Sequence, residues 1–484
     1  WRVARDIQKV GKYQDFNGAE AFFHVHVGEH NLYDSALMAK YLVAGGKPAV
    51  VFTHYMYGLW HYNMLPPWEI KLALVQTVAC GANPWIAFFN KGYESEPESL
   101  KPVSEIQGFL EKNDEYYTGV TSEATIAVHC SMQTSTYYIS EISELYRDLG
   151  TGRERDLIVD RGTGKVIVDW NTRKRLSEEA KGSSFLGFCQ SLWRGHMPFD
   201  VILDTGLNTQ TLQRYKVLIL PNSACLSATQ ISAIKEFVGN GGKLLATFET
   251  SLYDERGRRT ENRLNEVLGI KEIVGTFPAV LGENYMRVME DYPPFRKGRL
   301  LPRGPYCMKI KPARDVYTPI MFLEHIPRVY MPLTEESIYP ALMLNEYKTG
   351  AAAYFPQLIG LFYARYKMEE MRYLICSTVN VLKPSLPVEV LAPPTVQVEV
   401  YSQGSNRDRL IIHLVNNCGD MKRPISHITP VRNITIKIRS DIIEPRKVYA
   451  LRENLDAIKF KKVNDEVEID IPRLEFYEVL VAEA

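Results

Sequence analysis

Hydrophobic and polar positions alternate along residues 216–270 in the order expected of a β-α-β unit. The apolar run Val217–Leu220 is typical of a buried parallel strand. Ser227 stands at an expected helix N-cap, Gly241 follows the end of that helix, and Leu244–Thr247 predicts a second strand. The apolar residues of the helix fall on one face: Ile231, Ile234, Phe237 and Val238. The pattern therefore predicts an open, parallel α/β sheet in the middle of the chain.

Residues 1–105 show the same alternation of strand-like and helical runs. Three strands are predicted at Ala21–Val27, Ala49–Thr53 and Trp85–Phe89. Helices are predicted at Ser35–Val43 and Pro67–Ala79, and the proline of the second helix lies in the tolerated first turn. Strands separated by helices and joined by short connections favour a parallel sheet or a β/α barrel.

The segment Glu94–Lys112 is polar and contains prolines, so we predict a linker there. A second α/β region begins with a strand at Ala124–His129. Residues 280–340 contain many prolines and predict irregular structure. The remaining elements predicted for this region are a helix at Phe185–Arg194, strands at Phe199–Leu203 and Tyr347–Phe355, and a closing helix at Glu369–Leu382.

From about residue 393 onward the apolar positions repeat with a period of two, and turn residues separate the runs. This pattern predicts an antiparallel β-sandwich of modest size. Its predicted strands include Val396–Val400, Leu410–Val415, Ile434–Ile438, Glu466–Ile471 and Tyr477–Ala482.

Composition narrows the class of protein. At 484 residues, two to four domains are expected, and 57 basic residues balance 57 acidic residues. That balance gives no electrostatic reason to expect nucleic acid or an anionic membrane as a partner, and no apolar run approaches the roughly 18–20 residues of a membrane span. Seven isolated cysteines predict buried free thiols in a reducing compartment, without a cysteine zinc cluster. We further expect a cytoplasmic protein without a cofactor. Because the chain begins with Trp1, we expect its natural N-terminus to lie upstream.

Three segments resemble parts of family 42 β-galactosidases: Tyr215–Leu226, Gly241–Gly257 and Arg409–Asn417. The first two resemble the trimerisation domain of that family. The resemblance implies a multidomain α/β protein with the C-terminal portion of a (β/α)8 barrel (1–105), a flavodoxin-like or class I glutamine amidotransferase-like open α/β domain (118–385), and a C-terminal β-sandwich (393–484). It further implies a homo-oligomer, with a trimer favoured, and a carbohydrate substrate.

The first region resembles the last third of the hydrolase barrel, through a motif that runs from Trp60 through Pro67-Trp68-Glu69 and Gln76 to Trp85. In that register, the three predicted strands are the sixth, seventh and eighth of the barrel. Strands one to five would then lie upstream of Trp1, and the chain would be a fragment. An incomplete barrel does not close by itself.

Retaining glycosidases use two carboxyl groups about 5–5.5 Å apart. The resemblance places the acid/base on strand four, upstream of this chain, and a nucleophilic Glu at the end of strand seven. Here the end of strand seven carries His54, which departs from that pattern and puts conventional catalysis in doubt. Glu29 follows strand six on the face where barrel enzymes carry their active sites, so Glu29 and His54 are the candidate catalytic residues. Both are also interpretable as structural residues.

Other side chains of this region are candidates for substrate binding. His30 follows Glu29, and Tyr57, Trp60 and Trp85 are aromatic rings of the kind that stack on sugar faces, although ordinary packing explains such rings equally well. His24, His26 and His30 are close in sequence, but core histidines explain them better than a metal site, so we predict none.

The middle region lacks the chemistry of an amidotransferase. That chemistry needs a Cys at a strand-to-helix elbow, and the residues after the strand Leu244–Thr247 are Phe248-Glu249-Thr250. We predict that Glu249 makes a capping or inter-subunit contact, or reaches a neighbouring barrel. Two functions remain open: a glycoside hydrolase, and a non-catalytic, oligomeric carbohydrate-binding or assembly protein built from the same domains. A weaker third is an amidotransferase-like regulator.

Overall fold

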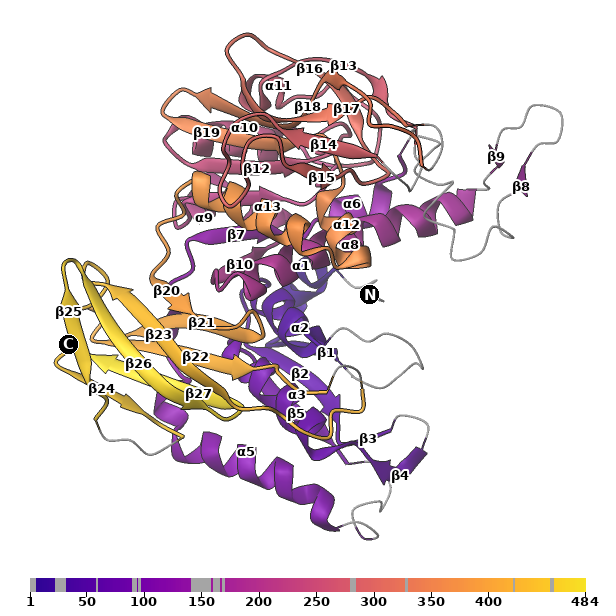
Figure 1. The fold of residues 1–484 in the computed structure, drawn as a ribbon. Helices are drawn as coiled ribbons and strands as arrows, with labels where there is room; N and C mark the ends of the chain where they lie inside the picture. The colour runs from indigo at the N-terminus through magenta and orange to yellow at the C-terminus, as the bar shows by residue number, and fades with distance from the viewer. Residues whose placement is uncertain are drawn as a thin grey trace. The chain divides into compact units, whose positions relative to one another are not determined.

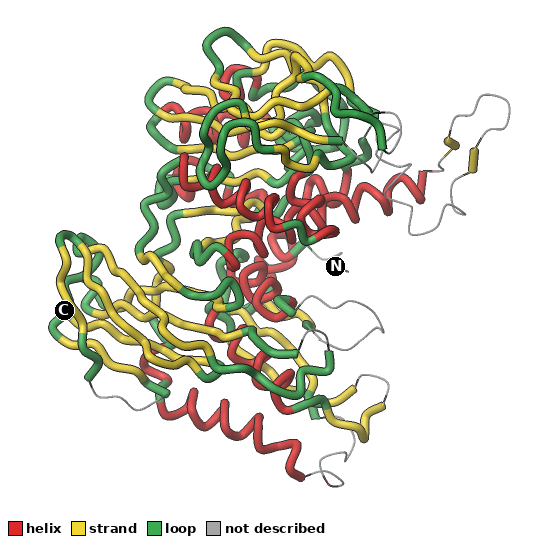
Figure 2. Tube along the Cα trace, in the orientation of Figure 1, coloured by secondary structure: helices red, strands yellow, loops and turns green. Residues whose placement is uncertain are grey.

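The computed structural model describes two compact units in this multidomain α/β protein. The first unit includes Ile126–Ser191 and Ile202–Pro384, and the second holds the described residues up to Thr125 together with Leu192–Val201 and Ser385–Ala484. Figure 2 shows helices and strands in both. The described residues are 6–21, 32–57, 60–88, 94, 97–140, 158–159, 166–167, 170–278, 284–326, 330–420, 423–452 and 457–484.

The first unit contributes the strands β7-β11-β12-β19-β18-β17-β14-β15, in this order, to a central sheet. Its strands β7, β11, β12 and β19 run parallel, which confirms the predicted β-α-β unit. The strands on the far side of β19 are antiparallel. The bounds are β7 Ile126–His129, β10 Phe199–Ile202, β11 Val217–Leu220, β12 Lys243–Thr247, β14 Tyr285–Val288, β15 Leu300–Pro302, β17 Tyr317–Leu323, β18 Glu336–Tyr347 and β19 Gly350–Phe355.

Helix α10 (Ala228–Gly239) forms as its sequence predicts. The Ser227 hydroxyl accepts a hydrogen bond from the Gln230 amide, and the Gln230 side chain accepts one from the Ser227 amide, which completes a capping box. All four residues of the predicted apolar face are buried. The other helices associated with this unit are α6 Met132–Tyr137, α8 Trp170–Arg194, α9 Thr209–Leu212, α11 Asn265–Leu268, α12 Ile359–Tyr366 and α13 Glu369–Val381, with the 3-10 turn η5 Asp204–Gly206 and the short strands β8 Ile158–Val159 and β9 Val166–Ile167.

The prediction of irregular structure at residues 280–340 is wrong, because this stretch supplies strands of the central sheet. It also contributes β16 (Met308–Pro312), which pairs with β13 (Ile270–Thr276) in a separate ribbon. Prolines are accommodated where the ladder ends or shifts register: Pro302 ends β15, and Pro340 lies opposite Met321 beside a register shift. The prolines of this stretch therefore lie at strand ends and register shifts, and they do not prevent the sheet from forming.

Helices α8 and α12 approach each other at two glycines. A Cβ atom added at Gly187 would lie 1.9 Å from the carbonyl oxygen of Gly360, and one added at Gly360 would lie 2.5 Å from the carbonyl oxygen of Ser184. Both contacts involve backbone atoms, so the two helices would have to separate to admit a side chain.

We therefore expect Gly187→Ala to destabilise the first unit by about 1–3 kcal/mol in a denaturant titration followed by circular dichroism. Gly182→Ala, on the same helix, is the matched control. No atom lies within 4 Å of a Cβ built there, so this change should stabilise by up to about 1 kcal/mol through helix propensity. Equal stability of the two variants would contradict the close helix crossing.

The second unit contains a parallel sheet in the order β1-β2-β5. Strands β2 (Ala49–His54) and β5 (Asn83–Ala87) correspond to the predicted strands Ala49–Thr53 and Trp85–Phe89, although β5 begins two residues earlier than predicted. The first described strand, β1, is Asn17–Glu20. Of the predicted strand Ala21–Val27, Ala21 follows β1, and residues 22–27 lie outside the described residues. Figure 1 shows α2 (Asp34–Val43) and α3 (Pro67–Ala79) beside these strands.

The predicted linker Glu94–Lys112 is wrong, because helix α5 (Lys101–Lys112) occupies most of it and packs against α3. Most residues of α5 are polar, but a narrow apolar stripe along it includes Val103 and Ile106, both of which are buried. Pro102 is tolerated because it lies in the first turn. The remaining short elements of this region are α1 Ile7–Val10, η1 Gly11–Tyr13, the hairpin strands β3 Met56–Tyr57 and β4 Trp60–Met64, η2 Pro97–Leu100 and η3 Asp114–Tyr116.

Two antiparallel sheets complete the second unit, in the orders β20-β23-β26-β25 and β24-β27-β22-β21-β6. Apolar side chains from both sheets share one buried core, which includes Val390, Val400, Ile436 and Leu480. All five predicted strands of this region are present. The bounds are β6 Val120–Ser122, β20 Val388–Leu391, β21 Val396–Gln403, β22 Arg409–Asn416, β23 Val431–Arg439, β24 Lys447–Ala450, β25 Phe460–Val463, β26 Glu466–Leu474 and β27 Tyr477–Glu483.

Candidate functional site

The three-stranded parallel sheet of the second unit has two different faces. Along β2 the side chains alternate: Ala49, Val51 and Thr53 are buried, whereas Val50, Phe52 and His54 are half-buried. Asn17 of β1 donates a hydrogen bond to the Leu42 carbonyl of α2, so the buried side is the one that the helices cover. On the other side Glu20 and Trp85 are exposed, whereas Phe52 and His54 are half-buried, so the described residues cover this side only in part; it is called the open face below.

One row of this open face combines a carboxylate with aromatic rings. Glu20 of β1 pairs with Phe52 of β2, and Phe52 pairs with Trp85 of β5. The Phe52 and Trp85 rings meet edge to face with centroids 5.1 Å apart, and Trp85 remains 56% exposed. His54 follows on the same face, with its ring centroid 5.4 Å from that of Phe52. Glu20 and Trp85 thus lie two strand spacings apart, on either side of Phe52, and together they offer a hydrogen-bond acceptor and an exposed ring on one face.

The predicted site residues fall into three groups. His54 ends β2, and Trp85 lies on the open face beside Phe52. Tyr57 and Trp60 pair with each other across the β3–β4 hairpin, where Trp60 is 62% exposed. Glu29 and His30 lie outside the described residues, as do His24 and His26, so the structure does not place them.

Sequence reasoning missed Glu20. The strand was placed at the apolar run after Ala21, and this shift left Glu20 outside any element. Strand β1, Asn17–Glu20, has almost no hydrophobic signal. Alternation along it could have put Glu20 on the open face only if its pairing with β2 had been known.

Several residues of the Trp60–Trp85 motif make buried packing contacts and do not lie on the open face. The Glu69 carboxylate is 1% exposed, forms an ion pair with Arg423, and accepts a hydrogen bond from the Ile425 amide at 3.0 Å. Gln76 donates to Asn417 at 2.8 Å. These side chains fasten helix α3 to the C-terminal sheets within the second unit.

At the predicted elbow of the first unit, Phe248 follows β12 with φ +47°, a strained value for a residue other than glycine. Glu249 is fully buried and accepts hydrogen bonds from the hydroxyls of Tyr138 (2.6 Å) and Tyr253 (3.2 Å). Burial raises the pKa of Glu249 despite these donors. Its contacts lie inside the unit, so the prediction that it caps a helix or reaches another subunit is wrong.

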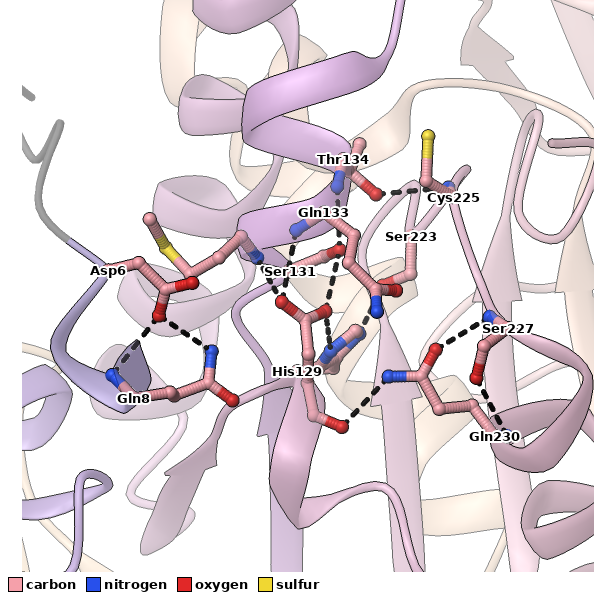
Figure 3. A network of polar contacts seen from close by, with 12 residues as sticks. Asp6, Gln8, His129, Ser131, Gln133, Thr134, Ser223, Cys225, Ser227 and Gln230 are labelled. Carbon is pink, nitrogen blue, oxygen red and sulfur yellow. Dashed lines mark hydrogen bonds and ion pairs between the residues drawn. The ribbon is translucent and has the colours of Figure 1, made fainter. Parts of the chain in front are cut away.

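A Ser-His-Asp chain lies where β7 and β11 end (Figure 3). His129 Nε2 donates to Asp204 Oδ1 at 3.2 Å, and His129 Nδ1 lies 2.8 Å from Ser223 Oγ. Asp204 also accepts from the Ser131 hydroxyl and from the amides of Met132 and Gln133. Burial alone would raise the pKa of Asp204, but the bonds from His129, Gln133 and Ser131 lower it below its ordinary value.

This chain has the connectivity of a hydrolytic triad but no access for a substrate. His129 and Ser223 are each 1% exposed, and Asp204 is 8% exposed. A nucleophile must reach the atom that it attacks, so the geometry fits a structural clamp across the sheet edge and not acyl transfer.

The described residues hold no group of three or more His, Cys, Asp or Glu side chains that could bind a metal ion. All seven cysteines are free, and six of them are buried, as their isolated positions predict. None of the helices in the described part of the chain has the length and apolar character needed to cross a membrane.

Residues 168–286 match the family model of the β-galactosidase trimerisation domain. This range includes the β11–α10–β12 unit, whose segments resemble that domain. The chain is therefore β-galactosidase-like in the domain that it carries.

Three solved structures share the fold. α-L-Fucosidase isoenzyme 2 from Paenibacillus thiaminolyticus is 16% identical with a TM-score of 0.75, and the similarity covers 99% of this chain and 67% of that one. A GH42 β-galactosidase from G. stearothermophilus is 16% identical with a TM-score of 0.65, and a β-galactosidase from Bacillus circulans sp. alkalophilus is 14% identical with a TM-score of 0.63. Each of these two similarities covers 99% of this chain and 61% of the other protein. The chain thus spans about two thirds of the length of these proteins. At these identities the likeness concerns the fold.

Proposed function

We propose that this chain belongs to a carbohydrate-active glycoside hydrolase of the β-galactosidase type. The observation that carries the proposal is the open face of the β1-β2-β5 sheet, where Glu20, Trp85 and His54 present a carboxylate, an exposed ring and an imidazole together. The fold shared with β-galactosidases and an α-L-fucosidase supports it.

The finer architecture belongs to the same proposal. In this interpretation the β1-β2-β5 sheet is the C-terminal part of a β/α barrel within residues 1–105, residues 118–385 form an amidotransferase-like trimerisation domain, and residues 393–484 form a β-sandwich. The matched trimerisation domain supports a homo-oligomer, and we favour a trimer. The proposed partners are carbohydrate substrates in the cytoplasm.

The proposed roles follow from chemistry. Trp85 would stack on the C–H face of a sugar ring, and Glu20 would accept hydrogen bonds from its hydroxyls. Glu29 is the proposed carboxylate catalyst, and His54 the group that binds a hydroxyl or positions water, with His30, Tyr57 and Trp60 beside the substrate. A neutral imidazole offers one donor and one acceptor, so His54 suits either role.

One observation favours the alternative of a non-catalytic carbohydrate-binding protein. The end of β2 carries His54 in place of a carboxylate, and an imidazole cannot form the glycosyl ester of a retaining mechanism. This alternative would be supported if the natural protein that contains this chain binds a sugar tightly but does not hydrolyse it.

The direct test is to incubate that natural protein with aryl β-D-galactosides, aryl α-L-fucosides and plant oligosaccharides. We expect turnover of at least one substrate. We also expect Trp85→Ala to raise KM about tenfold while kcat stays nearly unchanged, because the stacked ring binds ground state and transition state alike. Tyr373→Ala, which removes an exposed ring on α13, is the control. Absence of turnover across the panel would refute the hydrolase proposal.

A further inference from the structure

A second pocket lies in the second unit, at the amino-terminal end of β5. Its volume is about 480 Å³, which is within the range of about 300–1,000 Å³ typical of small-molecule sites. Asn83 at the start of β5 lines it, whereas His54 pairs with Ala87 at the other end of that strand. Asn83 lies two residues, about 7 Å, from Trp85 on the same strand, and four residues, about 13 Å, from Ala87. Glu20, His54 and Trp85 do not line the pocket, so it neighbours the open-face site without including its residues.

The pocket is aromatic at its wall and acidic at its mouth. Tyr116 of η3 and Tyr117, the residue that follows η3, contribute rings, and Glu111 and Asp114 contribute carboxylates. Gln107 of α5 adds an amide. Among the described residues that line it, no Lys or Arg is present. Such a lining disfavours phosphates and other anions, and it offers acceptors for hydroxyl groups beside rings for apolar C–H faces.

The lining of this pocket also includes a buried histidine that is hydrogen-bonded in a chain with two tyrosines. His413 of β22 is 3% exposed and lines the pocket. Its Nδ1 bonds the Tyr477 hydroxyl at 2.9 Å, which in turn bonds the Tyr117 hydroxyl at 2.9 Å. Among the described residues, Nε2 has no hydrogen-bond partner. Burial, with repulsion from Lys40, lowers the pKa of His413 to about 3, so the ring is neutral at ordinary pH.

A neutral imidazole offers one donor and one acceptor, and Nδ1 of His413 already uses one of them. The tyrosine–tyrosine–histidine chain fixes the His413 ring, so Nε2 is held ready for one hydrogen bond to whatever enters. We propose that this pocket is a second, non-catalytic site for a neutral saccharide unit. A ring face would lie on Tyr116 or Tyr117, with hydroxyls bonded to Glu111, Asp114 and His413 Nε2.

The test is isothermal titration of the whole protein with D-galactose, D-glucose and L-fucose, and separately with spermidine and inorganic phosphate. We expect at least one sugar to bind, and Glu111→Ala to weaken that binding about tenfold by removing a charged hydrogen-bond acceptor. Gln107→Trp should abolish it by filling the pocket. Glu115→Ala is the matched control, because this neighbouring exposed carboxylate pairs with Arg409 and does not line the pocket.

The variants separate this site from the open face. His54→Ala and Trp85→Ala should leave the sugar binding that depends on Glu111 unchanged. The proposal is overturned if no sugar binds, if only spermidine or phosphate binds, or if sugar binding is lost in His54→Ala but kept in Gln107→Trp. The titration measures sugar binding and not turnover, so its result tests this pocket even if the hydrolase proposal fails.

Discussion

Replacing Lys40 with Met should destabilise the second unit by about 3–5 kcal/mol. The Lys40 ammonium is 4% exposed and lies 2.7 Å from the Glu399 carboxylate, which itself is 2% exposed. Lys40 also donates to the Phe199 carbonyl at 2.7 Å. Removing the cation leaves a buried carboxylate with only neutral donors, from Trp193 at 2.8 Å and Gln397 at 3.2 Å. An uncompensated buried charge costs far more than an exposed pair contributes.

The pKa of Lys40 gives the sign of the pH dependence. Burial lowers this pKa, but the charges of Glu399, Tyr401 and Asp200 raise it, and the net pKa lies well above the ordinary value of 10.5. A raised lysine pKa stabilises the fold fully below the unfolded-state value and loses this contribution as pH rises through the folded-state value. The penalty of Lys40→Met should therefore be fully present at neutral pH and should diminish only above about pH 10.5.

Urea unfolding followed by tryptophan fluorescence measures the effect, because Trp193 is part of the cluster. Lys461→Met is the matched control: that ammonium is 70% exposed, 3.8 Å from Glu468, and should contribute about 0–1 kcal/mol. Adding Glu399→Gln to Lys40→Met should recover part of the loss by removing the orphaned charge. A loss below about 1 kcal/mol in Lys40→Met would show that the pair is not buried as described.

Asp204→Ala should cost the first unit about 3–4 kcal/mol, because several buried donors lose their acceptor together. These donors are His129 Nε2, the Ser131 hydroxyl, and the amides of Met132 and Gln133. The substitution also releases the ring of His129, whose Nδ1 contacts Ser223 across the sheet edge. Denaturant unfolding monitored by circular dichroism reports the loss.

The pH dependence of that loss identifies the carboxylate as its source. Because the folded-state pKa of Asp204 is lowered, its contribution is present above the unfolded-state value of 3.8 and disappears as pH falls through the folded-state value. Wild type and Asp204→Ala should differ most near neutral pH and converge in acid. Asp291→Ala is the control: this exposed carboxylate accepts one amide bond, from Lys297, so its removal should cost less than about 1 kcal/mol. A pH-independent difference would assign the loss to packing and not to charge.

Sequence patterns located the elements with a strong local period and missed the others. Helix α3 forms at Pro67–Ala79 and β11 at Val217–Leu220, both as predicted, because their apolar periods are complete within the element. Strand β1 and helix α5 were missed because Asn-Gly-Ala-Glu has no apolar alternation and the α5 stripe is narrow. The same limit applies to the candidate site: sequence patterns identified His54 and Trp85, which lie on or next to predicted strands, but not Glu20, which lies on a strand without an apolar pattern.

What the sequence by itself determined is therefore local: the β-α-β unit with its capping box, the two-residue alternation of the C-terminal strands, and the resemblance carried by contiguous segments. Only the tertiary structure decided which distant groups meet. Glu69 with Arg423, Lys40 with Glu399, and His129 with Asp204 and Ser223 are pairs separated by tens to hundreds of residues. Periodicity records how a residue relates to neighbours within a turn or a pleat, whereas the partner of a buried charge is chosen by how the chain packs.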